Sequence, residues 1–100
     1  MSTLGTELKI NVHVDPIDGL HMSDYDFVCA FFTFKNRLVV IPKSKMTRVD
    51  DDNYIAIVDT ARTGLGGLKL RFEADIPDTD CDDGIRKEIS VVDLNIPILP

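Results

Sequence analysis

Apolar and polar residues alternate with a period of two along most of the chain, which is the pattern of half-buried β-strands. Residues 8–14 show this alternation near the start of the chain. Residues 68–76 alternate without interruption and give the strongest strand signal. Residues 85–92 alternate less regularly and predict a last strand. Because no stretch has the 3.6-residue period of a long amphipathic helix, the pattern predicts an all-β protein.

Three shorter segments are apolar on both alternating faces, and they predict strands that are buried from two sides. They are residues 27–34, 38–41 and 54–58, each rich in aromatic or β-branched side chains. Every second residue of the first segment shares a face, and the alternation leaves two sets that could face the core: Phe27, Cys29 and Phe31, or Val28, Ala30, Phe32 and Phe34.

Turn-forming residues separate the apolar segments. They occupy positions 15–19, 50–53 and 77–84, and residues 35–37 suit a tight hairpin. Residues 60–67 predict either a single helical turn or a wide connection.

These segments amount to six or seven short strands without a helix to cover a sheet, which predicts a β-sandwich, with a small barrel as the alternative. We expect a single domain over residues 1–100. Residues 1–6 and 93–100 are expected to be peripheral tails.

The composition and charge narrow the choice of partners. The chain has 100 residues, of which 44% are hydrophobic and 28% charged, as in an ordinary globular protein. Its net charge of -6 at pH 7 repels phosphate backbones and anionic lipids. No apolar run reaches the length of a membrane span, and residues 1–6 are too polar for a signal peptide. We therefore expect neither a nucleic acid nor a membrane as a partner.

The two cysteines are too few for a disulfide framework. Cys29 lies in an apolar strand segment, whereas Cys81 lies among aspartates in a turn. The chain also lacks the tryptophan that packs on the inter-sheet bridge of an immunoglobulin domain. We expect both thiols to stay reduced in a protein made inside the cell.

The acidic turn at residues 78–84 superficially resembles a calcium loop. An EF-hand needs glycine at its sixth position and glutamate at its twelfth, where this chain has Asp83 and Ile89. We interpret the turn as solvated, and a weak calcium site is the alternative. His13 and His21 are the only histidines, too few for a zinc site, and are expected at the surface. No metal and no cofactor is predicted.

Candidate nucleophiles lack the neighbours that would activate them. Ser23, Ser44 and Ser90 are not set in a strand–turn–helix elbow, and neither cysteine lies beside an obvious base. The glycine-rich residues 63–67 lack the lysine and the following helix of a phosphate-binding loop. The sequence therefore predicts a protein without catalytic residues.

A small basic cluster, Lys43, Lys45 and Arg48, precedes the aspartates at residues 50–52. In a chain this acidic, we expect the cluster to pair with those aspartates rather than with a nucleic acid.

The apolar segments supply more apolar surface than the inner faces of a two-layer sandwich need. Apolar area on an outer face marks a protein contact, unless the tail at residues 93–100 or a long loop covers it. The tail itself either packs on its own domain or adds to the sheet edge of a neighbour. The residues that we expect in a protein interface are Val28, Phe32, Phe34, Leu94, Ile96, Ile98 and Leu99.

Several stretches of the chain resemble one family. They are residues 54–60 (YIAIVDT), residues 64–68 (GLGGL), and residues 76–78 (IPD) with residues 83–88 (DGIRKE). They are similar to small immunoglobulin-like modules of phages and prophages from Bacteroidota-type gut bacteria, found in baseplate, fibre and head-decoration proteins. The resemblance covers most of residues 7–92.

The resemblance implies an immunoglobulin-like β-sandwich of about seven short strands that serves as a structural component of a virion. It implies no catalytic residues, synthesis in the bacterial cytoplasm, and assembly with other virion proteins or with copies of the chain. The alternative is a carbohydrate- or cell-surface-binding module, for which Tyr25 and Tyr54 are the tyrosines that could stack on a sugar.

Overall fold

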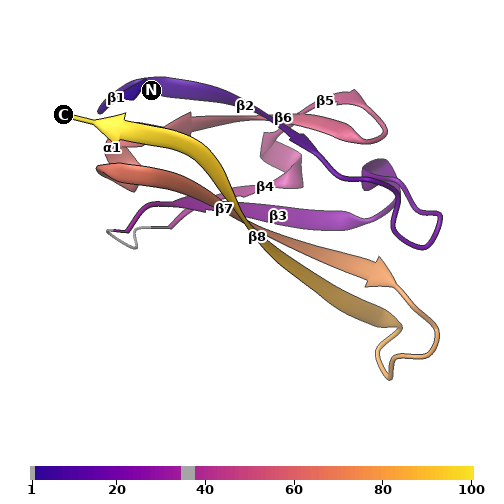
Figure 1. Ribbon diagram of the computed structural model, residues 1–100. Helices are drawn as coiled ribbons and strands as arrows, with labels where there is room; N and C mark the ends of the chain where they lie inside the picture. The colour runs from indigo at the N-terminus through magenta and orange to yellow at the C-terminus, as the bar shows by residue number, and fades with distance from the viewer. Residues whose placement is uncertain (1, 35–37) are drawn as a thin grey trace.

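The computed structural model describes residues 2–34 and 38–100, which form two facing β-sheets (Figure 1). The strands are β1 (Ser2–Thr3), β2 (Glu7–His13), β3 (Asp26–Phe32), β4 (Val39–Pro42), β5 (Thr47–Asp50), β6 (Asn53–Asp59), β7 (Gly66–Pro77) and β8 (Ile85–Leu99). The large sheet has the order β1-β8-β7-β3-β4, and the small sheet has the order β2-β6-β5. Adjacent strands are antiparallel, except that β1 and β8 are parallel. The predicted all-β architecture is confirmed.

One hydrophobic core lies between the sheets and is filled by alternate residues of their strands. The ring of Phe27, on β3, lies near its centre. Its centroid is 5.2 Å from that of Tyr54 in the small sheet and 5.3 Å from that of Phe72 in the large sheet. β7 buries Leu68, Leu70, Phe72, Ala74 and Ile76, as its strict alternation predicts.

The segments that are apolar on both faces are buried from one side only. In β3, Phe27, Cys29 and Phe31 face the core. The intervening residues point to the outer face of the large sheet, where Val40 of the neighbouring β4 is 58% exposed. The prediction of two-sided burial was therefore wrong, because two layers provide only one interior.

The turns lie where the sequence predicts them. Ile17 and Leu20 exchange two backbone hydrogen bonds of 2.9 Å around Asp18 and Gly19, both with positive φ. Residues 60–67 contain the single helical turn α1 (Thr60–Thr63), whose first turn is capped by the Asp59 carboxylate. The predicted hairpin at residues 35–37 lies outside the described residues.

The basic cluster is divided between two roles. Arg48 pairs with Asp51 across the turn between β5 and β6, as predicted. Lys43, which begins the 3₁₀-helix η2 (Lys43–Lys45), instead donates to three backbone carbonyls, those of Met22, Ser23 and Tyr25. Those carbonyls belong to or directly follow the 3₁₀-helix η1 (Met22–Asp24), so the ammonium ties the β2–β3 connection to the large sheet.

The last strand is longer than predicted, and the expectation of a peripheral tail at residues 93–100 was wrong for most of that segment. β8 continues to Leu99, and Ile98 is only 1% exposed in the core. Two extra residues, Leu94 and Asn95, form a bulge between the pairs Lys69–Asp93 and Leu68–Ile96.

Asp93 stabilises this bulge, because its Oδ1 accepts a hydrogen bond of 2.9 Å from the backbone N–H of Asn95, which has a φ of 56°. Pro97 has no backbone N–H to donate. It lies just before Ile98 and Leu99, the residues of β8 that pair with β1, so the proline removes no hydrogen bond from that pairing.

Residues 3–6 are exposed, but their backbone is attached to the domain. β1 pairs with Ile98 and Leu99, and the hydroxyl of Thr60 accepts from the N–H of Gly5 and donates to the carbonyl of Thr6. Residues 2–6 therefore close the end of the large sheet instead of extending freely from it.

We expect Ile98→Ala to lower the free energy of unfolding by about 3 kcal/mol, because it removes a buried side chain from the core. The matched variant Ile57→Ala, at an exposed position of β6, should change it by less than about 0.5 kcal/mol. Chemical denaturation measures both values, and equal effects would contradict the position of Ile98.

Candidate functional site

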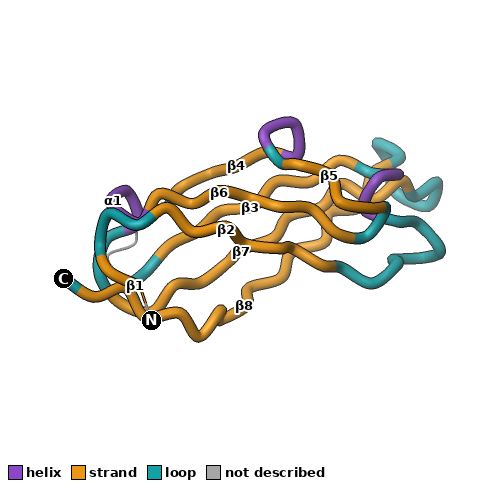
Figure 2. The backbone as a smooth tube through the Cα atoms, turned by 90° about the horizontal axis from the view of Figure 1, so that it is seen from above, coloured by secondary structure: helices purple, strands orange, loops and turns teal. Residues whose placement is uncertain are grey.

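The middle of β8 is exposed on both of its faces. Every residue from 89 to 93 is exposed, and the run contains three apolar side chains: Ile89, Val91 and Val92. Figure 2 shows the reason, since β8 runs beside the small sheet rather than beneath it. Val92 points toward the interior side and is nevertheless 47% exposed. Such a strand is a ready site for pairing with another chain.

The same strand has a free edge over most of its length. β7 pairs with β8 along one side, whereas β1 occupies the other side only at Ile98 and Leu99. Within the described residues, no strand pairs with that side of β8 before Ile98. Backbone N–H and C=O groups along this edge are therefore open to a partner strand.

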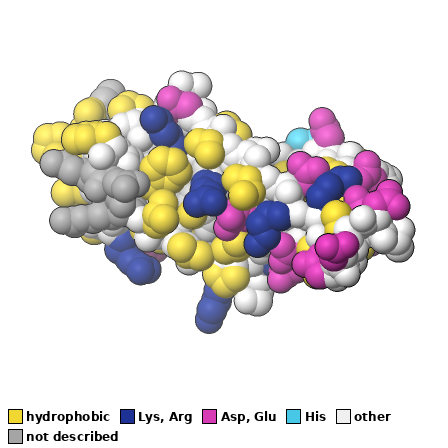
Figure 3. Space-filling view, turned by 90° about the horizontal axis from the view of Figure 1, so that it is seen from below, with side chains coloured by type: hydrophobic (Ala, Val, Ile, Leu, Met, Phe, Trp, Pro, Cys, Tyr) yellow, Lys and Arg dark blue, Asp and Glu magenta, His cyan; other side chains and the backbone are white. Residues whose placement is uncertain are grey.

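The outer face of the large sheet carries apolar residues on both sides of a charged strand. β7 presents Lys69, Arg71, Glu73 and Asp75 outward, with an Arg71–Glu73 ion pair of 3.1 Å. Figure 3 shows hydrophobic side chains between basic ones on this face, and acidic side chains gathered toward one end. The apolar residues beside β7 are Val28, Ala30, Phe32 and Val40 on one side and Ile89 and Val91 on the other.

A groove of about 300 Å³ lies between β2 and the inward side of β7 and β8. Its apolar lining includes Val12, Leu70, Phe72 and Val92, and its polar lining includes His13, Asp15, Glu88 and Ser90. The groove exists because β2 is the edge of the small sheet and leaves the inward side of β8 partly uncovered.

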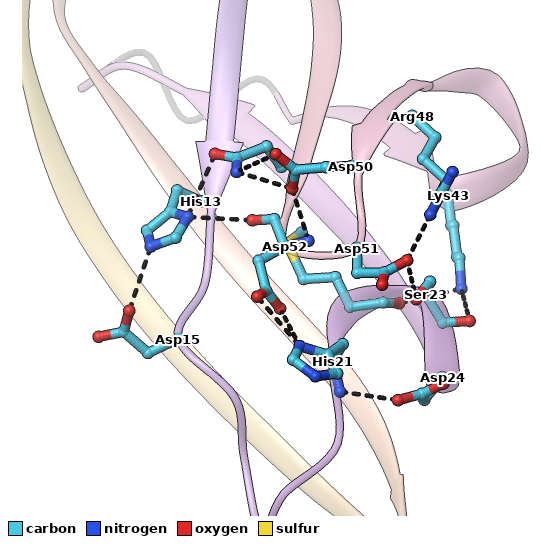
Figure 4. Close-up of polar contacts among 12 residues, drawn as sticks. His13, Asp15, His21, Ser23, Asp24, Lys43, Arg48, Asp50, Asp51 and Asp52 are labelled. Carbon is cyan, nitrogen blue, oxygen red and sulfur yellow. Dashed lines mark hydrogen bonds and ion pairs between the residues drawn. The ribbon is translucent and has the colours of Figure 1, made fainter.

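A polar network surrounds the end of the sandwich beside this groove (Figure 4). His13 Nε2 lies 3.1 Å from Asp15 Oδ1, and its Nδ1 lies 3.1 Å from both the Asp52 carbonyl and Asn53 Oδ1. The Nδ1 of His21 lies 2.9 Å from Asp52 Oδ1. The two histidines therefore tie the β2–β3 connection to the β5–β6 turn.

Both histidines are held in an acidic environment. The hydrogen bond with Asp15 is the largest cause of the raised pKa of His13. The hydrogen bond and charge of Asp52 raise the pKa of His21. On the neighbouring turn, the hydrogen bond from Asn53 lowers the pKa of Asp50, and that from Arg48 lowers the pKa of Asp51. Protonated histidines and ionised aspartates thus favour the same arrangement of loops.

Ser90, His13 and Asp15 line one groove, but their geometry does not form a serine–histidine–aspartate relay. Asp15 occupies Nε2 of the ring, and the β5–β6 turn occupies Nδ1. A relay needs one ring nitrogen facing the hydroxyl and the other facing the carboxylate. The ring of His13 is used to hold the loops together.

The carboxylates of the turn at residues 78–84 serve the turn and its neighbours. Asp78 Oδ1 accepts from the N–H of Asp80, and Asp83 Oδ1 accepts from the N–H of Ile85. Arg86 reaches Asp78 at 2.9 Å and Asp18 of the β2–β3 connection at 2.6 Å. Across residues 2–34 and 38–100, no group of three or more His, Cys, Asp or Glu side chains is placed to hold a metal ion.

The two thiols lie in different places, and both cysteines are free. Cys29 is in the core, where burial raises its pKa to about 12 and keeps it in the unreactive thiol form. Cys81 is half-buried in the turn between β7 and β8.

The residues predicted for a protein interface do not form one surface. Val28 and Phe32 are half-buried on the outer face of β3, and Phe34 follows that strand and lies against Gly66. Leu94 and Ile96 pack against the protein's own core and Ile98 belongs to it, whereas Leu99 is 38% exposed. Including Ile98 was a mistake, because the tail is part of its own sheet.

The sequence did not single out Val40, Ile89, Val91 and Val92, which the structure places at the surface. The adjacent pair Val91–Val92 was a usable signal, because two consecutive apolar residues in a strand cannot share one buried face. The tail also alternates, with apolar residues at 92, 94, 96 and 98, but its two prolines outweighed this pattern in the prediction.

No family model matches the chain, and no curated protein or solved structure does. In the described part of the chain, no helix is long and apolar enough to span a membrane. The fold and the open side of the sandwich therefore define the protein as a two-sheet β protein with an exposed strand edge.

We expect the stability of the protein to fall as the pH rises above the ordinary histidine pKa of 6.5. A raised histidine pKa means that folding favours the protonated ring. This stabilisation is complete below the ordinary pKa of 6.5 and is lost as the pH passes through the raised value. Thermal unfolding of the wild type and of the double variant His13→Gln, His21→Gln should show a weaker pH dependence in the variant. Parallel curves for the two proteins would contradict the assignment.

Proposed function

We propose that this protein is a non-enzymatic structural module that acts by protein–protein assembly. The observation that carries the proposal is the exposed run at residues 89–93, which combines apolar side chains with an open strand edge. The tail at residues 93–100 does not cover the outer face, because nearly all of it belongs to β8. Val91 on that face is therefore 60% exposed. A contact with another protein would bury these side chains.

The proposed fold is an immunoglobulin-like β-sandwich. The order β2-β6-β5 corresponds to strands B, E and D of an immunoglobulin domain, and β4-β3-β7-β8 corresponds to C′, C, F and G. The short β1 then takes the place of strand A and crosses to the edge of β8. This correspondence supports the finer fold assignment, although the inter-sheet disulfide of antibody domains is replaced here by apolar packing.

The biological setting that we propose is a phage virion, as a head-decoration, fibre or baseplate adaptor made in the bacterial cytoplasm. This part of the proposal rests on the resemblance to such modules, which covers most of residues 7–92. Its partners are other virion proteins or copies of the chain. A net charge of -6 supports a protein partner rather than a nucleic acid or an anionic membrane.

The alternative of a sugar-binding module receives no support from the tyrosines. Tyr25 and Tyr54 are each only 4% exposed, and both lie in the core. Their rings therefore cannot stack on a carbohydrate at the surface.

Particles released by the cells that encode this chain should contain it at a constant ratio to their major structural protein. Mass spectrometry of gradient-purified particles measures that ratio. A chain with Val40→Asp should be incorporated at least about tenfold less, because the outer face of the large sheet loses apolar contact area. Ile57→Asp, an equally exposed change on the small sheet, is the matched control. Absence of the wild-type chain from the particles would contradict the virion role.

A further inference from the structure

We propose that the partner of the exposed edge is a second copy of the chain, bound through antiparallel pairing of the two β8 strands about Ser90. This inference rests on the proposed function, because it names one partner for the assembly surface. A two-fold axis through Ser90, perpendicular to the sheet, would join two large sheets into one continuous sheet.

The edge is long enough for such a pairing. Residues 86–93 precede the bulge at Leu94 and Asn95, and their outer side carries no strand in the described part of the chain. The five consecutive exposed residues from 89 to 93 form the C-terminal part of this stretch. A partner strand would therefore meet no element that has to move.

The outward side chains are self-complementary in this register. Pairing about Ser90 places Ile89 opposite Val91 of the second copy and Lys87 opposite its Asp93. Because the axis is two-fold, each of these pairs occurs twice. The apolar pairs lie beside the axis, and the opposite charges lie outside them.

The charges continue across the neighbouring strands. Within one chain, Lys87 Nζ lies 3.5 Å from Asp75 Oδ1, and Asp93 lies opposite Lys69 in the β7–β8 pairing. The dimer would therefore align Asp75 and Lys87 of one copy with Asp93 and Lys69 of the other. Negative and positive side chains alternate along this row, an arrangement that stabilises neighbouring strands.

Pairing the two strands about a neighbouring residue would lose this complementarity of apolar and charged side chains. Pairing about Ile89 would place Lys87 opposite Val91, and pairing about Val91 would place Ile89 opposite Asp93. Pairing about Glu88 would bring the two Glu88 carboxylates together. Charge and hydrophobic complementarity thus select the register centred on Ser90.

The inward side of the pairing also gains contacts. Ser90 would lie opposite Ser90 of the second copy, and Val92 would lie opposite Glu88 of the second copy. The side chain of Val92 borders the groove beside β2, so a second β8 would cover the open side of that groove. The pairing therefore shields the inward apolar residue that the small sheet leaves uncovered.

Sedimentation velocity over a dilution series should show a reversible monomer–dimer equilibrium of the wild-type chain in the micromolar range, because a single-strand contact is small. Lys87→Asp or Asp93→Lys should each raise the dissociation constant at least about tenfold, since each places two pairs of like charges across the axis. Lys45→Asp makes the same charge change at an exposed position outside β8 and should leave the constant unchanged.

Mixing the two charge variants in equal amounts provides the sharpest test. In the mixed dimer, aspartate at 87 meets lysine at 93, and the native Asp93 meets the native Lys87. We expect the mixture to dimerise within about threefold of the wild-type affinity. Circular dichroism and thermal unfolding of each variant alone would show that the monomers remain folded.

A cross-link gives an independent readout of the register. In a Cys81→Ser background, Ser90→Cys should form an intermolecular disulfide on oxidation, because the two residues lie directly opposite each other. Val92→Cys should cross-link far less, since it faces Glu88 of the other copy.

The outcomes separate this inference from the proposed function. A wild-type chain that stays monomeric at every concentration overturns the second copy as the partner, whereas incorporation into particles would still support the structural role. A dimer that is insensitive to both charge variants and does not cross-link through Ser90→Cys overturns the β8 pairing. A dimer that the variants disrupt and their mixture restores supports it.

Discussion

The small sheet is narrower than the large sheet, and this difference determines which side chains of the large sheet are buried. The small sheet covers the inner faces of β3 and β7, whose alternate residues fill the core around Phe27. β8 lies past its edge, so Val92 is half-exposed although it points inward, and a groove opens beside β2. Only near its C-terminal end does β8 contribute a fully buried residue, Ile98.

Hydrogen bonds and ion pairs of charged side chains hold the loops at one end of the sandwich together. At one end of the sandwich, His13 and His21 hold the β2–β3 connection against the acidic β5–β6 turn. Arg86 joins the same connection to the β7–β8 turn through Asp18 and Asp78. The histidine, arginine and aspartate side chains at this end are thus occupied by contacts with one another. The polar side chains at this end of the molecule hold its loops together, whereas the middle of β8 leaves apolar side chains exposed.

The strand pattern was a reliable guide where one face of a strand is buried against the other sheet. β2 and β7 show this, because each alternates along the sequence as it does in the structure. β5 was not predicted, since all four of its residues are exposed and its polar sequence has no apolar face. The tail was misjudged because Pro97 outweighed the alternation of Leu94, Ile96 and Ile98. Its place in β8 depends on pairing with residues far away in the chain, Gly66 to Leu68.

The sequence by itself determined the all-β composition, the main turns and the residues that face inward from β2 and β7, because these follow from local alternation and turn chemistry. It left the inward face of β3 open between two sets of residues. The tertiary structure decided which apolar surfaces remain exposed. Ile98 and Val91 are both apolar residues of one strand, yet one is in the core and the other at the surface. Their difference comes from the relative position of the two sheets, which arises from contacts between distant segments and leaves no local pattern in the chain.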